Sequence, residues 1–306
     1  LEIGDDEFNV SSYFNLGKNN STFEIVIKTQ ILWRNASNLL ARNISSRLNW
    51  FNLEKPLAVS CAINGDLKKD GDPKIVVTAV IKNDKLQSPG GLLTDCSFNG
   101  KFTNNFKEGL GFNDANSAVL LNDFSAKYQK IPFVIPEGRI LNFDKPMAKG
   151  ILNSDFDVRS LNDIIGENLI RFHGGKAKVN LNFEFDIIDV YLRKPRFTGS
   201  IRVKNMSSNY VAKRLTFEKT DLQLDFTDKA LFIRKFKFKD RRNTIFIEGE
   251  IDDFLNLYYD APEKMLVNWN IYSPHLDVKQ FIGVLALRLT SRAAKERQAK
   301  RRYFSD

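Results

Sequence analysis

The sequence predicts a mainly β protein: a long curved antiparallel sheet forming a groove, or two β modules, with a few flanking helices and a C-terminal basic amphipathic helix. Three observations support this fold class. Apolar and polar residues alternate along many segments of the 306-residue chain. Hydrophobic residues make up 42% of the chain and aromatic residues 12%, so it can bury a core. Few segments show the 3.6-residue period of an amphipathic helix.

The clearest alternating segment, residues 178–187, predicts an extended strand with two different faces. Polar residues occupy one face, and the other carries Val179, Leu181, Phe183, Phe185 and Ile187. The same alternation recurs in 57–63, 75–81, 197–203, 245–251 and 265–271. This pattern indicates antiparallel strands with one apolar and one solvated face. A sandwich or barrel in which these faces pack together, and an open curved sheet covered by helices or lipid, both satisfy it.

Two features predict local irregularities in the strands. A turn at 227–229 separates two apolar runs, which is typical of a β-hairpin. The second run changes parity between Ile233 and Phe236, so we expect a bulge near Arg234 to restore the register. Three similar strand segments also contain a central glycine, which predicts a bulge or a close backbone contact at Gly100, Gly199 and Gly249.

Three segments predict helices. Residues 35–49 place one apolar stripe along a helix, formed by Leu39, Leu40, Ile44 and Leu48. Residues 159–167 predict a short helix in the middle of the chain. The strongest helical pattern runs from Asp277 to about Arg302, where an apolar stripe gives way to a basic run.

The segment 146–175 mixes glycine, asparagine and a helical stretch, which is typical of a junction between modules. We therefore predict an N-terminal β module with one amphipathic helix at 1–150, a C-terminal β module at 151–275 and a basic helix at 276–306.

The formal net charge of +9 is concentrated near the C-terminus. Residues 288–302 contain one acid and seven bases, a net charge of +6, which leaves +3 for the other 291 residues. Such a helix could bind anionic lipid head groups, bind nucleic acid, or simply be exposed to solvent. Nucleic acid is the poorest match, because no basic sheet face interleaved with aromatic residues accompanies the helix. The candidate contacts with an anionic membrane are Arg288, Arg292, Lys295, Arg297, Lys300, Arg301 and Arg302.

Cysteine and histidine are scarce, which argues against metal sites and histidine chemistry. Cys61 and Cys96 lack metal-ligand spacing, so we predict that both are free and packed, with a disulfide as the alternative in an oxidising compartment. His173 and His275 are interpreted as turn residues, because each adjoins glycine or proline.

The acidic residues also have ordinary structural interpretations. Asp66, Asp70 and Asp72 lack calcium-loop spacing and predict a hairpin turn. Glu248 and Glu250 alternate with apolar residues and are interpreted as the solvated face of a strand rather than a glycosidase pair. No nucleophile elbow, P-loop or dinucleotide fingerprint occurs. We predict no enzymatic activity, no cofactor and no metal.

Several segments resemble AsmA-like proteins. Residues 197–205 (FTGSIRVKN) are similar to the F-x-G-x-hydrophobic-x-hydrophobic-x-N strands near the C-terminus of that family, as are the strands that follow, up to 247–251. Residues 273–281 (SPHLDVKQF) look like the family's entry into a helix. The asparagine-rich composition is similar to that of family members from the Bacteroidota. The resemblance covers about residues 50–290, and its motifs are degenerate β patterns; the basic C-terminal helix departs from the family pattern.

The resemblance implies a non-enzymatic envelope protein that takes part in outer-membrane assembly or in phospholipid transport between membranes. It implies a periplasmic location, anchorage in the inner membrane in the full-length protein, and phospholipid or another envelope lipid as partner, together with envelope assembly proteins. The positions that match a lipid groove are Val179, Leu181, Phe183, Phe185, Phe197, Ile201 and Val203. The alternatives are a structural or adhesive β-sandwich that binds glycans or proteins, and a carboxylate hydrolase.

The chain begins at Leu1 rather than Met and shows no signal peptide, which we interpret as a fragment of a longer protein. No apolar run approaches the roughly 18 residues of a membrane-spanning helix.

Overall fold

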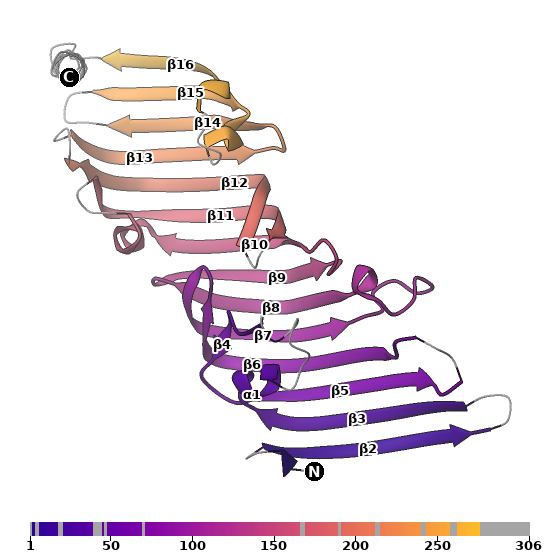
Figure 1. Cartoon of the computed structure of the whole chain (residues 1–306). Helices are drawn as coiled ribbons and strands as arrows, with labels where there is room; N and C mark the ends of the chain where they lie inside the picture. Colours follow the sequence, from indigo (N-terminus) through magenta and orange to yellow (C-terminus); the bar gives the residue numbers. More distant parts are fainter. Residues whose placement is uncertain are drawn as a thin grey trace, which may run out of the picture.

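The computed structural model describes residues 2–3, 6–17, 21–38, 45, 48–68, 71–165, 169–188, 191–211, 215–239, 243–257 and 262–275. These residues form one long, open antiparallel sheet whose strands follow one another in chain order (Figure 1). The first half of the sheet consists of β1 (Glu2–Ile3), β2 (Asp6–Leu16), β3 (Ser21–Ile31), β5 (Leu57–Asp66), β6 (Lys74–Ser88), β7 (Gly91–Thr103), β8 (Ala118–Tyr128) and β9 (Ile131–Leu141). The second half consists of β10 (Met147–Asp157), β11 (Ile170–Ile188), β12 (Tyr191–Tyr210), β13 (Leu215–Phe226), β14 (Ala230–Lys239), β15 (Thr244–Asp252) and β16 (Leu266–His275).

The mainly β fold predicted from the alternation is confirmed, and the open curved sheet is the form that it takes. The short strand β4 (Asn52–Leu53) pairs with β6 beside the main path. The strands are long because the alternation is sustained: β11 has 19 residues and β12 has 20. At a strand spacing of about 4.8 Å, fifteen strands extend the sheet over about 65–70 Å.

The helices are short and lie at the ends of strands. α1 (Trp33–Asn38) follows β3, so the helix predicted at 35–49 begins two residues earlier than expected. Ser45 and Leu48 are also helical, whereas Leu39, Leu40 and Ile44 lie outside the described residues. The helix predicted at 159–167 is a 3₁₀ helix, η2 (Val158–Asp163). Further 3₁₀ helices are η1 (Asp114–Asn116), η4 (Phe254–Leu257) and η5 (Pro262–Lys264).

The predicted irregularities of the strands are largely confirmed. The 227–229 turn joins β13 to β14, and the register between β14 and β15 shifts between Ile233 and Phe236, around the expected bulge. Gly199 makes the predicted close backbone contact, because a Cβ there would lie 2.2 Å from the Asn180 carbonyl oxygen. Gly249 is similar, with the Asn268 carbonyl oxygen at 2.3 Å, whereas the nearest atom at Gly100 is an ordinary 3.4 Å away.

The interpretation of the histidines as turn residues is wrong. His173 lies within β11, and His275 is the last residue of β16. The two glycines that suggested a turn instead shift the register of β11 against β12, and Gly175 has a φ of +122°. A left-handed glycine inside a strand accommodates a bulge without ending the strand.

The sheet continues through the predicted junction of the two modules. Residue 150 lies inside β10, which pairs with β9 on one side and β11 on the other. The division at 150/151 thus falls within a continuous ladder, and the existence of two modules stays a prediction. The predicted helix at 276–306 lies outside the described residues.

Candidate functional site: the concave apolar face

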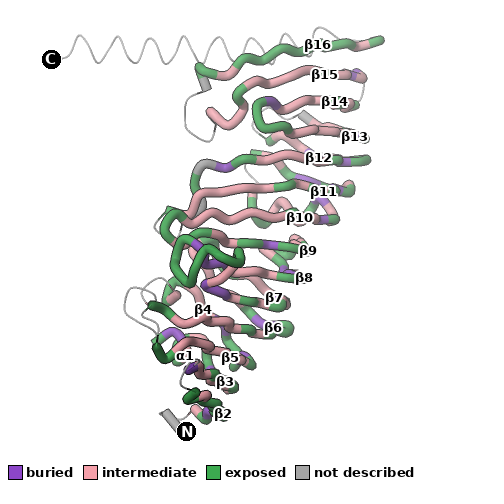
Figure 2. Tube along the Cα trace, turned by 90° about the vertical axis from the view of Figure 1, so that its right-hand side faces the viewer, coloured by how far each residue is buried: buried purple, intermediate pink, exposed green. Residues whose placement is uncertain are grey.

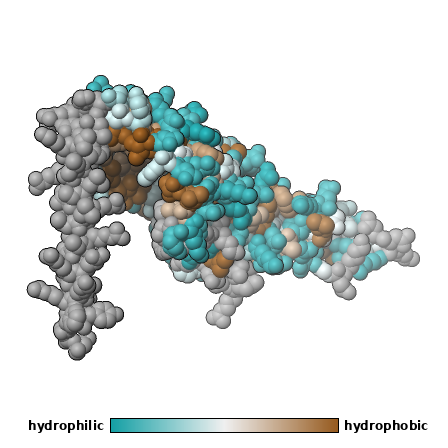
Figure 3. Space-filling view, turned by 90° about the horizontal axis from the view of Figure 1, so that it is seen from above, coloured by the Kyte–Doolittle hydropathy of each residue, from teal (hydrophilic) through white to brown (hydrophobic). Residues whose placement is uncertain are grey.

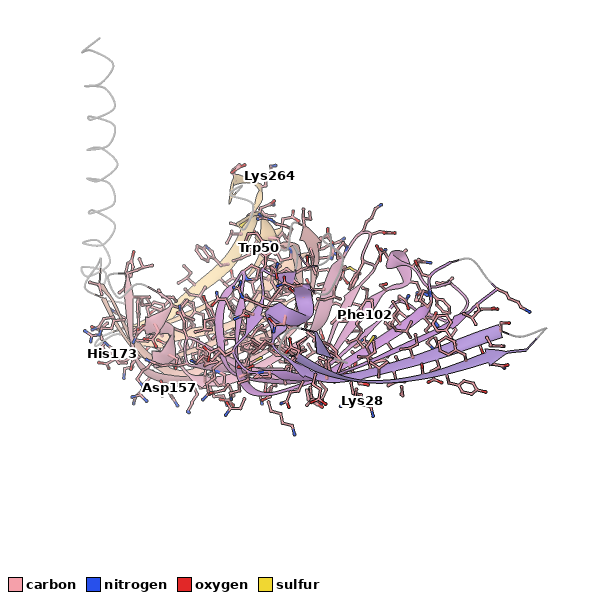
Figure 4. All side chains as sticks on the ribbon, turned by 60° about the horizontal axis from the view of Figure 1, so that its bottom comes forward. Lys28, Trp50, Phe102, Asp157, His173 and Lys264 are labelled. Carbon is pink, nitrogen blue, oxygen red and sulfur yellow. The ribbon has the colours of Figure 1, made fainter. Side chains whose placement is uncertain are left out.

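The two faces of the sheet differ in chemistry, because one carries a continuous row of apolar side chains and the other is mostly polar. The register places apolar residues opposite apolar residues from strand to strand: Ile27 faces Cys61, Val77 faces Phe102, and Leu152 faces Leu181. We call this side of the sheet the apolar face. It lies on the concave side, where Trp50 and Phe102 are seen, whereas Lys28 projects from the opposite, convex side (Figure 4).

The seven residues predicted for a groove all lie on the apolar face. Val179 pairs with Ile201, and Phe183 pairs with Phe197, across β11 and β12. The two strands bring three phenylalanine rings together: Phe185 lies 5.7 Å from Phe183 and 5.4 Å from Phe197 between ring centroids. Two glycines, Gly150 of β10 and Gly199 of β12, pair with Phe183 and Leu181 of β11. The Phe183 ring packs closely on Gly150, where a Cβ would lie 3.1 Å from it. The seven residues are Val179, Leu181, Phe183, Phe185, Phe197, Ile201 and Val203.

The apolar face extends well beyond these seven residues, which sequence reasoning missed as part of the site. Toward the C-terminus it continues through β13 to β16, where Leu224 faces Ile233 and Ile247 faces Ile271. Toward the N-terminus it continues to β2, where Val10 faces Ile27. The signal was present, because segments 57–63 and 245–251 have the same alternation, but alternation does not tell which faces are joined.

Burial on the apolar face is uneven. We call the edge that carries α1 and η2 the α1 edge, and the opposite edge, which carries η1, the η1 edge. The buried apolar side chains of this face lie in the half next to the α1 edge: Phe8, Ile31, Leu57, Ile81, Cys96, Phe124, Ala126, Phe172, Ala177, Val203 and Ile245. Trp33 and Ala36 of α1 pack on the cluster that contains Ile31 and Leu57. Leu161 of η2 packs on the cluster that contains Phe172.

The remainder of the apolar face is only half-buried. Six of the seven predicted residues are in this intermediate class, and Val203 alone is buried, with 9% of its surface exposed. Within the described residues no second sheet packs against the face. Intermediate and exposed residues accordingly predominate along the strands (Figure 2). From the β16 end, hydrophobic side chains gather in a hollow flanked by hydrophilic ones (Figure 3).

The convex face is mostly polar and carries several ion pairs, although single apolar side chains such as Val80 and Ile151 are exposed on it. Arg196 forms ion pairs with Glu184 and Asp186. Arg234 forms another with Asp225, in which Nε lies 3.1 Å from Oδ2. A shallow hollow of about 500 Å³ near β9 to β12 gathers Arg139, Lys149 and Glu184 among its lining residues. The carboxylate of Glu184 is engaged by an arginine there. Glu248 and Glu250 also lie on the polar face of β15, opposite Asn270 and Asn268, as predicted.

The two cysteines are free, as predicted. Cys61 is half-buried on β5, and Cys96 is fully buried on β7. Burial, with a smaller contribution from the nearby negative charge of Asp84, raises the pKa of the Cys96 thiol to about 12. Burial also raises the pKa of Cys61. Both thiols are therefore poor nucleophiles at neutral pH.

The other predicted site elements are placed as follows. Asp66 ends β5 and Asp72 precedes β6, so this acidic segment is the expected hairpin connection, although Asp70 lies outside the described residues. The seven basic residues of the C-terminal segment, from Arg288 to Arg302, also lie outside them. In the described part of the chain, no three His, Cys, Asp or Glu residues are grouped as metal ligands.

No helix among the described residues is sufficiently long and apolar to cross a membrane. Comparisons with models of protein families, with curated proteins and with solved structures return no match for this chain. The resemblance to AsmA-like proteins therefore depends on the sequence motifs quoted above.

Proposed function

We propose that the concave apolar face binds lipid acyl chains and shields them from water. The observation that carries the proposal is the continuity of this face from β2 to β16, combined with its half-buried side chains and with the absence of a second layer among the described residues. A contiguous apolar surface of this size is rare on a soluble protein unless it has a partner. Each square ångström of apolar surface removed from water contributes about 25 cal/mol.

The shape of the face supports an elongated, flexible apolar ligand. The α1 edge supplies a packed wall of buried side chains, two clusters of which are covered by α1 and η2. The side chains toward the η1 edge are half-buried, so they offer contact area along the whole length of the sheet. The polar convex face and its ion pairs remain available to water. In this arrangement acyl chains lie along the concave face and head groups stay at its rim.

The resemblance to AsmA-like proteins supports the wider setting. We propose a non-enzymatic role in the envelope, in membrane assembly or in phospholipid transport between membranes, with lipid as the partner and with a periplasmic location. The basic segment 288–302 would contact anionic membranes in this setting. The adhesive alternative required a sandwich, whereas the described residues form one open sheet.

A matched pair of lysine substitutions tests lipid binding. Leu181 lies on the apolar face, and its neighbour Asn182 lies on the polar face of the same strand. We expect Leu181→Lys to reduce uptake of a fluorescent phospholipid by on the order of tenfold, since a charge would have to be desolvated against the acyl chains. Asn182→Lys should leave uptake unchanged.

Uptake is measured with delipidated protein, and bound lipid is identified by native mass spectrometry. Thermal unfolding of both variants controls for loss of fold, and Phe183→Ser provides an uncharged second change on the same face. If the wild-type chain neither copurifies with lipid nor takes it up, or if the two lysine variants behave alike, the apolar face does not serve as a lipid site.

A further inference from the structure

The last strand of the sheet, β16, has an edge suited to pairing. It pairs with β15 on one side, and no strand among the described residues pairs with its other side. Residues 266–274 include no charged residue. Five of its large side chains are exposed: Leu266 (59%), Val267 (39%), Trp269 (56%), Ile271 (61%) and Tyr272 (62%). Natural sheets usually protect such an edge with charges, bulges or a covering element.

The opposite end of the sheet is protected in that way over the first residues of β2 only. β1 pairs with the first residues of β2, so it occupies part of that strand's outer edge. The paired residues include Glu2, Asp6 and Glu7, whose charges disfavour the approach of a like strand. Beyond these residues the β2 edge is open as well, because residues 8–16 carry no charge and expose Val10, Tyr13, Phe14 and Leu16. The lack of protection is therefore common to both ends, and the symmetry of its sequence distinguishes β16.

The sequence of β16 is also symmetrical in residue type about its centre. Residues 266–272 (LVNWNIY) are centred on Trp269. Asn268 and Asn270 flank it, followed outward by Val267 and Ile271 and then by Leu266 and Tyr272. An antiparallel pairing of two such strands about Trp269 therefore matches asparagine with asparagine, aliphatic with aliphatic, and leucine with tyrosine. Cross-strand neighbours of this kind are the pairs that stabilise antiparallel sheets.

The faces match as well as the pairs. Val267, Trp269 and Ile271 lie on the apolar face, because they pair with Ile251, Gly249 and Ile247 of β15. Asn268 and Asn270 lie on the convex face, opposite Glu250 and Glu248. A register centred on Trp269 keeps odd-numbered residues opposite odd-numbered residues, so each side chain meets a partner on its own face. A register shifted by one residue would place asparagine opposite the apolar residues.

We propose that two copies of this chain associate through β16, paired antiparallel about a two-fold axis through Trp269. This axis is perpendicular to the sheet, so the two sheets become one and both concave faces lie on the same side. If the apolar face binds lipid as proposed above, the dimer doubles the length of that surface. The dimer itself depends only on the β16 edge, so it stands or falls separately from lipid binding.

The expected affinity is modest. One strand pair of seven matched residues buries an area at or below the low end for specific interfaces, which is about 1,200 Å². The absence of charge on the edge means that no ion pair is desolvated and that no like charges are opposed. We expect a reversible dimer with a dissociation constant on the order of micromolar, which sedimentation measurements over a range of concentrations detect.

Disulfide trapping tests the register directly. In the proposed pairing Trp269 lies opposite its own copy, with Cα atoms about 4.5–5.5 Å apart, which suits a disulfide. We expect Trp269→Cys to form a covalent dimer under mild oxidation. Ile271→Cys is the matched control, since its two copies would lie about 14 Å apart at 3.4 Å per residue. Mixing Val267→Cys with Ile271→Cys should yield a covalent heterodimer.

The wild-type chain under the same conditions controls for Cys61 and Cys96. Ile271→Lys should weaken the dimer at least tenfold, because it places two charges at the edge. Failure of Trp269→Cys to crosslink, or equal crosslinking by Ile271→Cys alone, would overturn the proposal. A ladder of higher oligomers would also overturn it, because this would indicate head-to-tail pairing of β16 with β2.

Discussion

Single residues set the shape of the apolar face where strands approach closely. Gly199 has a φ of +126° and lies opposite Leu181, with the Asn180 carbonyl oxygen where a Cβ would be. A side chain there would require both an unfavourable backbone conformation and displacement of the neighbouring strand. The position therefore needs glycine for two independent reasons.

Replacing this glycine tests the argument. We expect Gly199→Ala to lower the free energy of unfolding by about 1–3 kcal/mol. Gly90→Ala is the control, since the nearest atom to its Cβ position, Ser88 Oγ, is 3.7 Å away. Urea unfolding of both variants measures the difference. Equal stability of the two variants would contradict the close contact at Gly199.

The buried thiol of Cys96 makes a second prediction at this scale. With a pKa of about 12, roughly one thiol in ten thousand is ionised at pH 8, and only the thiolate reacts readily. We expect a thiol reagent to leave Cys96 unmodified in the folded protein and to modify it after unfolding in urea. Peptide mapping of the labelled sites measures this. Rapid labelling of Cys96 in the native protein would contradict its burial.

Among the elements, η2 shows how a short segment covers one edge of the face. Asp157 precedes η2, and its carboxylate accepts hydrogen bonds from the backbone N–H and the guanidinium of Arg159. The side-chain bond to Arg159 is the main reason that the pKa of Asp157 falls to about 2. Val158 and Leu161 can then pack on Phe172 and Val203 below.

The lowered pKa predicts a pH dependence. A carboxyl whose folded-state pKa is depressed stabilises the fold above its unfolded pKa, near 4, and this contribution is lost as the pH falls toward 2. Because the Arg159 side chain is 64% exposed, solvent screening limits the effect to below about 1 kcal/mol. We expect Asp157→Asn to melt slightly below wild type at pH 6 and together with it at pH 2. Thermal unfolding of the variant and the wild type at the two pH values measures the difference.

Most elements were predictable, because alternation determines which residues share a face of a strand. The bulge near Arg234 was predictable for the same reason, since a parity change within one apolar run has few other solutions. The strand around His173 was not, because Gly174 and Gly175 are equally typical of turns and of bulges. Local pattern also left open whether the apolar faces close on one another, since that depends on how strands far apart in sequence curve together.

The whole molecule presents apolar and charged surfaces in different places. The apolar face accounts for the groove positions, whereas most of the net charge belongs to residues 288–302. The two features therefore predict separable properties: acyl-chain binding by the sheet and attraction to anionic membranes by the C-terminal segment.

Deletion of residues 288–302 tests that separation. We expect the truncated chain to retain the circular dichroism of the β sheet and its phospholipid uptake, while its binding to vesicles containing phosphatidylglycerol falls severalfold. Binding of the full chain should also weaken with added salt, since screening acts within about 10 Å at 0.1 M. Unchanged vesicle binding after the deletion would show that the segment has no membrane role.

The chain-order arrangement of strands shown in Figure 1 has a consequence for how such a protein is made and lengthened. Each hairpin needs only its predecessor as a template, so the sheet can assemble progressively as the chain leaves the ribosome, without waiting for distant segments. Adding or removing one hairpin changes the breadth by about 10 Å and leaves every other pairing intact. The span of the concave surface is thus adjustable in fixed increments, in the manner of a solenoid.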